Sequence, residues 1–381
     1  MKKNHYDAIV TDASQRVSLE LTRALGENGL RVLNVEKDCY RRSVISSSSR
    51  YSSGFEIVPD YSSGRFLEIC EKATAVFPVS TNTNISVYNK ALVQFPEKFL
   101  LPSREAFLKA NSKPSAMGIS AELGIPCPKT ATLKNGECPF ETMNEFGFPL
   151  VLKLADDENL SLEPQDRYGI AGSGKEAEIV WNRLKVHGKD ILVQEYLSGG
   201  GFGWSAIYDR DGTCSAEITH MRLREYPVSG GPSSYCMAFR DDTISSYGRK
   251  ILDHLKWTGP AMVEFKKNSK GEIKFLEINP RYWGSLPLAR RAGINIPYIH
   301  YQLLTGNKEK LDVRYREGAR IKFRGMDFMA GLQEFKKSSG KTSYSFKFIC
   351  DFLNPFISDG IFSFKDPIPG LVYVWKNLFR R

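Results

Sequence analysis

K-F-L-E-I-N-P-R-Y-W-G-S, residues Lys274–Ser285, is the stretch that decides the fold. Apolar and polar residues alternate along it, which is the pattern of a β-strand with one buried face. The alternation predicts that Leu276 and Ile278 point into a core, whereas Glu277 and Asn279 point to the opposite face. A purely structural strand has no need of an acid and an amide ahead of a Pro-Arg pair. The polar face of this strand is therefore a candidate site.

A second strand of the same kind precedes it at Met262–Lys266, where the apolar residues again share one face and Glu264 takes the other. With Lys270-Gly271 as the two-residue turn of a hairpin, Glu264 lies directly opposite Glu277. Like charges in that arrangement destabilise a sheet unless something neutralises them. A divalent cation bound by carboxylate and amide oxygens would do so. The alternative is a solvent-facing hairpin whose acids are neutralised by lysines on the same strands.

The composition is that of a soluble globular protein. The chain has 381 residues, 41% hydrophobic and 25% charged, which predicts two or three domains. No apolar run reaches the length of a membrane span, and the N-terminus lacks the apolar stretch of a signal peptide, so we expect a cytoplasmic protein. Seven cysteines without a C-x-x-C pair predict free thiols and argue against a structural zinc site.

The formal net charge of +10 is concentrated near the end of the chain. Residues 311–381 hold 13 Lys/Arg and 7 Asp/Glu, so +6 of the charge lies there. This favours either contact with an anionic membrane surface or an ordinary solvated face. No basic block interleaved with aromatic residues occurs, and we therefore do not expect nucleic-acid binding.

The first hundred residues alternate between strand and helix patterns. Strands are expected at Tyr6–Thr11, Leu30–Val35 and Ala75–Val79, with a helix at Ser18–Gly26. This order predicts a parallel sheet. The first strand–helix turn lacks the G-x-G-x-x-G fingerprint, so a Rossmann-like topology is expected without dinucleotide binding.

Two further features bear on phosphate chemistry. Lys153 interrupts the apolar strand Phe148–Leu154, where an ammonium group needs an anionic partner or a path to the surface. Gly169–Glu176 is one residue short of a P-loop, because Glu176 stands where the magnesium-binding Ser or Thr would be. We interpret it as a flexible glycine loop whose backbone N–H groups could approach phosphate oxygens.

A pair of arginines suggests an acceptor site. Arg222 and Arg224 are spaced to share one face of a strand, and their guanidinium groups suit a carboxylate or an acylphosphate. The Gly230-Gly231 turn that follows is a candidate anion-binding turn. The alternative is a basic edge strand that ends in a Gly-Pro turn.

Six motifs together resemble the ATP-grasp enzymes, in the branch of carbamoyl-phosphate synthase-like domains and carboxylate–amine ligases. In chain order they are Lys113, Gly124–Thr130 (G-I-P-C-P-K-T), Phe148–Lys153 (F-P-L-V-L-K), Val193–Leu197 (V-Q-E-Y-L), Val263–Phe265 (V-E-F) and Leu276–Arg281 (L-E-I-N-P-R). The resemblance covers roughly residues 1–306. It implies an α/β (α+β) chain made of a Rossmann-like pre-ATP-grasp domain (1–110), an N-terminal lobe with a glycine lid (111–190), a C-terminal lobe with the adenine hinge and metal site (191–306), and a basic aromatic extension (307–381).

The resemblance also implies roles for single residues. Lys113 and Lys153 correspond to phosphate-binding lysines, Gly169 to the start of the lid, and Gln194, Glu195 and Leu197 to the adenine hinge. Glu264, Glu277 and Asn279 correspond to ligands of Mg²⁺, for which two ions are expected and Mn²⁺ is a substitute. Arg281 corresponds to the arginine that meets the acceptor carboxylate or the transferred phosphoryl group, and Arg222 and Arg224 add to that site. No acid follows the hinge, which leaves the ribose ligand unassigned.

The implied function is an ATP-dependent ligase that joins a small carboxylate to a small amine through an acylphosphate, releasing ADP and phosphate. The alternative is a non-catalytic ATP-binding module held at a membrane surface by the C-terminal segment. Homo-oligomerisation is left open, and Tyr282-Trp283 is where we expect acceptor specificity.

Overall fold

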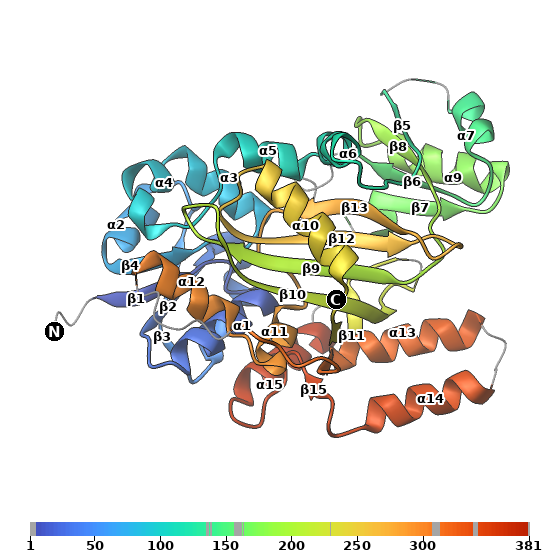
Figure 1. Ribbon diagram of the computed structural model, residues 1–381. Coiled ribbons are helices and arrows are strands. Elements are labelled where there is room, and N and C mark those ends of the chain that lie inside the picture. The colour runs from blue at the N-terminus through green and yellow to red at the C-terminus, as the bar shows by residue number, and fades with distance from the viewer. Residues whose placement is uncertain are drawn as a thin grey trace.

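The computed structural model describes residues 5–134, 137, 139–155, 162, 164–228, 230–306, 313–337 and 342–379. Figure 1 shows three sheets, one in each of three successive regions of the chain. The mixed α/β class expected from the sequence is confirmed.

The first region is a sheet in the order β3-β2-β1-β4, and its strands are parallel, as the strand–helix alternation predicts. Its strands are β1 (Tyr6–Val10), β2 (Val32–Lys37), β3 (Ser52–Val58) and β4 (Ala73–Phe77). Its helices are α1 (Arg16–Gly26), α2 (Gly64–Glu71), α3 (Thr81–Asn89) and α4 (Ala91–Gln94), with 3₁₀ turns η1 (Asp38–Ser43), η2 (Ser46–Ser48) and η3 (Pro96–Lys98). The carboxyl ends of β1 and β4 lead directly to α1 and α3, so both helices begin at the same edge of the sheet.

The second region is a small antiparallel sheet in the order β5-β8-β6-β7, preceded by α5 (Arg104–Asn111) and α6 (Lys113–Glu122). It consists of β5 (Thr130–Leu133), α7 (Phe140–Phe146), β6 (Leu150–Leu154), α8 (Pro164–Arg167), β7 (Tyr168–Ala171), α9 (Gly174–Lys185) and β8 (Ile191–Glu195). Because β8 pairs with β5 and β6, residues 191–195 belong to this lobe and not to the larger one to which the sequence assigned them.

The third region is a sheet in the order β13-β12-β9-β10-β11-β14-β15. Its first part comprises β9 (Gly201–Tyr208), β10 (Cys214–Glu225), β11 (Ser233–Phe239), α10 (Asp242–His254), β12 (Gly259–Lys267), β13 (Ile273–Asn279), α11 (Leu286–Ala292) and α12 (Ile296–Leu304). One face of this sheet packs on α10 and α6, and the other packs on α1, α11 and α12. Burial on both faces explains why every residue of β9 is buried.

The chain after residue 306 contributes to the third region, the one that contains the large sheet. It supplies β14 (Arg320–Lys322), α13 (Arg324–Lys337), α14 (Thr342–Leu353), β15 (Ser358–Asp359) and α15 (Ile368–Phe379). β14 extends the large sheet next to β11, and β15 pairs with β14. Figure 1 shows α13 and α14 as a helical pair that extends from the end of this sheet. Within the described residues, no helix has both the length and the hydropathy that crossing a membrane requires.

The decisive hairpin forms, with two corrections. β12 and β13 are antiparallel, and the predicted pair of Glu264 and Glu277 is confirmed. The turn between them is the three residues Ser269–Gly271, closed by Asn268 and Glu272, and not the expected two-residue turn Lys270-Gly271. A bulge follows, so that Phe265 pairs with Phe275 and Leu276 is the extra residue. Phe275 is therefore fully buried in the core, and Leu276 is not part of that core cluster.

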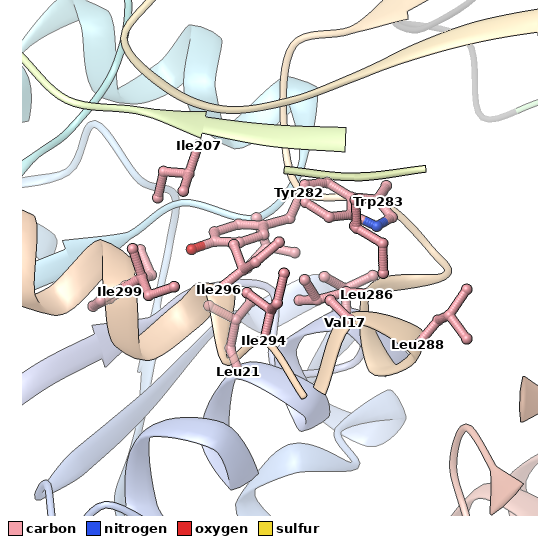
Figure 2. Close-up of a cluster of buried hydrophobic side chains, with 14 of the residues drawn as sticks. Val17, Leu21, Ile207, Tyr282, Trp283, Leu286, Leu288, Ile294, Ile296 and Ile299 are labelled. Atoms are coloured by element: carbon pink, nitrogen blue, oxygen red, sulfur yellow. The ribbon is translucent and has the colours of Figure 1, made fainter. Parts of the chain in front are cut away.

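The residues after the hairpin form core. Figure 2 shows Tyr282 and Trp283 packed among Val17, Leu21 and Ile294, and each of the two aromatic side chains is only 1% exposed. The Tyr282 hydroxyl and His300 Nδ1 lie 2.7 Å apart, which satisfies the polar end of the ring. Their burial corrects the expectation that this pair selects the acceptor: they join α1 to the large sheet.

Candidate functional site

The candidate site is a cavity of about 570 Å³ where the first sheet, the large sheet and the C-terminal segment meet. Four of the residues expected from the sequence line it: Arg222, Glu264, Asn279 and Arg281. They come from β10, from β12, from the end of β13 and from the turn after β13. Residues that the sequence did not indicate complete the wall, among them Arg16, Arg167, His220, Ser285, Met326 and Tyr373.

Glu264 is the carboxylate at the centre of the polar face. Asn279 Nδ2 donates to Glu264 Oε1 at 3.0 Å, and Arg222 Nη2 donates to Glu264 Oε2. Burial raises the pKa of Glu264, and the nearby Glu277 carboxylate adds to this rise, whereas Arg222 opposes it. Arg222 thus supplies a neutralising positive charge next to Glu264, which lies in cross-strand register with Glu277.

The two arginines of β10 diverge. A bulge between them places Arg222 opposite Cys236 and Arg224 opposite Tyr235, which interrupts the two-residue alternation on which the shared face depended. Arg224 donates to both carboxylate oxygens of Asp327, at 2.7 and 2.8 Å, and it does not line the cavity. It holds α13 on the sheet. Arg224 therefore does not contribute to the acceptor site, contrary to the prediction from the sequence.

Arg222 itself is strongly held. Its Nη1 donates to Glu225 Oε1 at 3.3 Å and to the carbonyl of Gly231 at 3.4 Å. Burial by itself would lower the pKa of the Arg222 guanidinium, but Glu264 and Glu225 outweigh it and hold that pKa above its ordinary value. The Gly230-Gly231 turn thus supports Arg222 through a carbonyl oxygen.

Arg281 differs from Arg222 in its partners. It donates to Thr81 Oγ1 at 3.2 Å, to the carbonyl of Tyr282 at 2.9 Å and to Asn279 Oδ1 at 2.8 Å. All of these acceptors are neutral, and no carboxylate among the described residues pairs with it. The positive charge of Arg281 is therefore uncompensated at the wall of the cavity, which is where an anionic reactant would be bound.

The predicted phosphate-binding lysines belong to the small lobe. Lys153 lies on β6 between Leu152 and Leu154, which are fully buried, so its side chain points away from their apolar cluster. Lys113 begins α6, and its Nζ lies 3.4 Å from the carbonyl of Leu154. The structure thus brings the two lysines to the same end of β6, although they are 40 positions apart in the sequence.

The predicted hinge connects the lobes. Gln194 is buried and its Nε2 donates to Thr130 Oγ1 at 2.9 Å, while Leu197 is 3% exposed. Glu195 accepts from Lys274 Nζ at 2.8 Å, an ion pair between β8 and β13. Partial burial raises the pKa of Glu195, but hydrogen bonds from Lys274 and from the Lys129 N–H outweigh it, and that pKa lies below its ordinary value. Lys274, the first residue of the decisive stretch, is the link between the sheets.

Comparisons with known proteins agree with this architecture. A family model described as "ATP-grasp in the biosynthetic pathway with Ter operon" matches residues 187–324. N5-carboxyaminoimidazole ribonucleotide synthetase in its ADP complex superimposes with a TM-score of 0.67, at 13% identity over 88% of this chain and 86% of that chain. Biotin carboxylase from Campylobacter jejuni gives a TM-score of 0.65, at 15% identity over 84% and 75% of the two chains. Residues 187–324 therefore match an ATP-grasp family, and the chain as a whole has the ATP-grasp fold.

Sequence relatives of this ATP-grasp chain are distant and much longer. Pyruvate carboxylase from Schizosaccharomyces pombe is 25% identical over 201 residues, covering 48% of this chain and 16% of that protein. The large chain of carbamoyl phosphate synthase from Methanobrevibacter smithii is 24% identical over 208 residues, covering 49% and 18%. The chain spans less than a fifth of the length of either relative.

One ATP-grasp assignment differs from the structure. The residues expected to form a flexible lid are regular elements: Gly169 lies in β7, and Gly174 begins α9. A β-carbon on Gly169 would lie 2.7 Å from Val180 and 2.8 Å from Arg183 Nη2, so this glycine allows β7 to pack closely on α9. The residue of this region that reaches the cavity is Arg167.

The donor set fits magnesium in type. Mg²⁺ prefers oxygen ligands and is held by one or two carboxylates together with water and substrate phosphates. Glu264, Glu277 and the Oδ1 of Asn279 offer such oxygens, and the carboxylates already face each other in register. Among the described residues no cluster of three or more His, Cys, Asp or Glu suits a metal, so this site would depend on the nucleotide to complete the coordination.

Proposed function

We propose that this ATP-grasp protein is an ADP-forming ligase that joins a carboxylate to an amine through an acylphosphate. The observation that carries the proposal is the convergence of Glu264, Asn279, Arg281 and Arg222 in one cavity, next to the carboxylate pair of β12 and β13. A module that only binds a nucleotide has little use for an uncompensated arginine beside two carboxylates.

The reaction has two displacements. In the first, a carboxylate oxygen of the substrate attacks the γ-phosphorus of ATP, and the bond from that phosphorus to the bridging oxygen breaks, which releases ADP. In the second, the amine nitrogen attacks the acyl carbon, the carbon–oxygen bond to phosphate breaks, and the nitrogen loses a proton. The products are an amide, ADP and phosphate.

The chain's own residues supply positioning and charge, which is what phosphoryl transfer chiefly requires. Arg281 would bind the reacting carboxylate and the phosphoryl oxygens, since none of its present partners is charged. Arg222 would hold the same group from the opposite strand while keeping Glu264 in place. Lys153 and Lys113 would bind the phosphates from the small lobe.

Glu264, Glu277 and Asn279 would hold Mg²⁺, which supplies neutralisation of the β- and γ-phosphate charge when bound. In the structure the Arg222 guanidinium neutralises the carboxylate of Glu264. To bind the ion, Glu264 would have to release Arg222, which would then be available to the substrate.

The test is ADP release from Mg·ATP in the presence of pooled carboxylates, bicarbonate included, and pooled amines. We expect turnover that requires one member of each pool and that falls at least about 100-fold in the Glu277→Gln variant. The matched control is Glu272→Gln, an exposed glutamate in the turn of the same hairpin, which should behave as wild type.

Two results would count against the proposal. Binding of ATP without turnover in any pool would favour a regulatory nucleotide-binding module. Equal turnover in Glu277→Gln and wild type would remove the metal assignment.

A further inference from the structure

The cavity holds more positive charge than the proposed chemistry uses. Among the described residues that line it, Arg16, Arg222 and Arg281 stand beside the carboxylate of Glu264. Arg222 pairs with that carboxylate, and Arg281 serves the reacting group in the proposed function. Arg16, which comes from the first domain, has no part in that scheme.

Arg16 is a cation without an anion. Its Nη1 lies 2.8 Å from the sulfur of Met326, and its guanidinium carbon lies 4.2 Å from the centre of the Phe323 ring. No carboxylate within the described part of the chain pairs with it. Burial lowers the pKa of the Arg16 guanidinium, as expected for a charge removed from water without an ionic partner. Such a group is costly to maintain unless a ligand supplies the anion.

The surroundings of Arg16 are built for an anion. It is the first residue of α1, whose N-cap, Gln15, makes no side-chain hydrogen bond to the first turn, and that turn contains no acid. Gln15 and Val17 line the cavity as well, so the positive end of the helix faces the same space as the guanidinium group.

The large-sheet region makes room for the Arg16 side chain. A β-carbon on Gly284 would lie 2.8 Å from Arg16 Nη2. Gly284 follows the buried Tyr282-Trp283 pair, which packs against Val17 of the same helix turn. The close approach of α1 therefore places the Arg16 guanidinium against the segment that follows Arg281, in the wall of the same cavity.

We propose that Arg16, with the N-terminus of α1, binds an oxyanion carried by the amine substrate, so that this substrate is an amino acid or a phosphorylated amine and not ammonia or a neutral amine. This inference rests on the proposed ligase function. It follows from which elements supply the charges. Arg281 and Arg222 come from the large-sheet region and serve the acyl group in the proposed function, whereas Arg16 comes from α1 and adds a further positive charge to the same cavity.

The experiment compares matched substrates. ADP release is measured with each amino acid and its α-carboxamide, and with aminoalkyl phosphates and the corresponding amino alcohols. We expect the anionic member of the active pair to be preferred. We also expect Arg16→Gln to raise its KM by about 10- to 100-fold, the range for losing a hydrogen-bonded charge, while the KM for ATP stays unchanged. Preference for the amino acid or for the phosphate identifies which oxyanion is bound.

Two variants control for structural damage. Gly284→Ala leaves Arg16 in the chain, but the added methyl group would displace the end of the Arg16 side chain. This variant should therefore also raise the KM for the anionic amine and leave the KM for the corresponding neutral amine unchanged. Arg65→Gln removes an exposed arginine of the same domain and should change neither constant. Equal use of the charged and neutral amines, or an equal effect of Arg16→Gln on both, would overturn the inference while leaving the ligase function intact.

A second readout does not depend on turnover. Thermal shifts of wild type and Arg16→Gln are measured with the same compounds in the presence of Mg·ADP. Stabilisation by an anionic amine that is lost in Arg16→Gln supports the oxyanion site even if the ligase proposal fails. The inference is overturned if no anionic amine stabilises the protein more than its neutral counterpart does and if turnover also shows no preference for the anionic amine.

Discussion

Replacing Asp366 with alanine should destabilise the protein by removing the ion pair that holds the C-terminal segment on the first domain. Asp366 Oδ2 accepts from Arg23 Nε at 2.8 Å and from Ser49 Oγ at 2.7 Å, and Oδ1 accepts from the Arg50 N–H at 2.9 Å. The side chains of Arg23 and Asp366 are 4% and 2% exposed. The contact links α1 to residues near α15.

The magnitude follows from burial. Removing one member of a buried ion pair leaves the other charge uncompensated and typically costs about 3–5 kcal/mol. In the alanine variant Arg23 would retain only the carbonyl oxygens of Ile361 and residue 366. The exposed pair Glu56–Arg65, with side chains 41% and 43% exposed, is the control, because such pairs contribute about 0–1 kcal/mol.

The assay is urea unfolding followed by tryptophan fluorescence, combined with hydrogen exchange of α15. We expect Asp366→Ala to lower the free energy of unfolding by about 3 kcal/mol or more and to accelerate exchange in α15, whereas Glu56→Ala changes neither. A loss of about 1 kcal/mol or less in Asp366→Ala, equal to that of Glu56→Ala, would refute the reasoning. The C-terminal segment would then be held by its apolar contacts alone.

Three further predictions concern pH, the hinge and the surface. Burial, aided by Arg222, lowers the pKa of His220 to about 3 from 6.5, so between those values the unfolded state binds a proton that the folded state excludes. Stability should therefore fall on acidification by up to about 1.4 kcal/mol per pH unit, and His220→Gln should flatten that slope; an unchanged slope in urea titrations would contradict this. Lys274→Met removes the ion pair between β13 and β8. It should raise the KM for ATP about fivefold, which corresponds to roughly 1 kcal/mol of lost binding free energy. An unchanged KM in an ATP titration would exclude a role of Lys274 in the hinge. Finally, we propose that the exposed apolar face of α13 contacts anionic membranes, since Phe328 and Leu332 are 48% and 43% exposed in the basic C-terminal segment. The double variant Phe328→Ser, Leu332→Ser should reduce flotation with anionic liposomes, and flotation equal to that of wild type would contradict the proposal.

The antiparallel hairpin of β12 and β13 was predictable because its information is local. The predicted pair of Glu264 and Glu277 forms because two deviations cancel: the turn has one residue more than predicted, and the bulge at Leu276 takes up the shift. The same reasoning failed where one extra residue entered a strand. A bulge moves Phe275 into the core in place of Leu276. Another separates Arg222 from Arg224, and alternation alone contains no sign of either insertion.

The sequence by itself determined the ATP-grasp motifs, the parallel arrangement of the strands in the first sheet and the carboxylate edge of β12 and β13, because each depends on residues close together in the chain. The tertiary structure decided which charges meet. Arg16 and Met326 are 310 positions apart, and Arg23 and Asp366 are 343 apart. Such contacts depend on how whole elements dock. For that reason the segment interpreted as a basic extension became β14, α13 and α15, and it closes the cavity through Met326 and Tyr373.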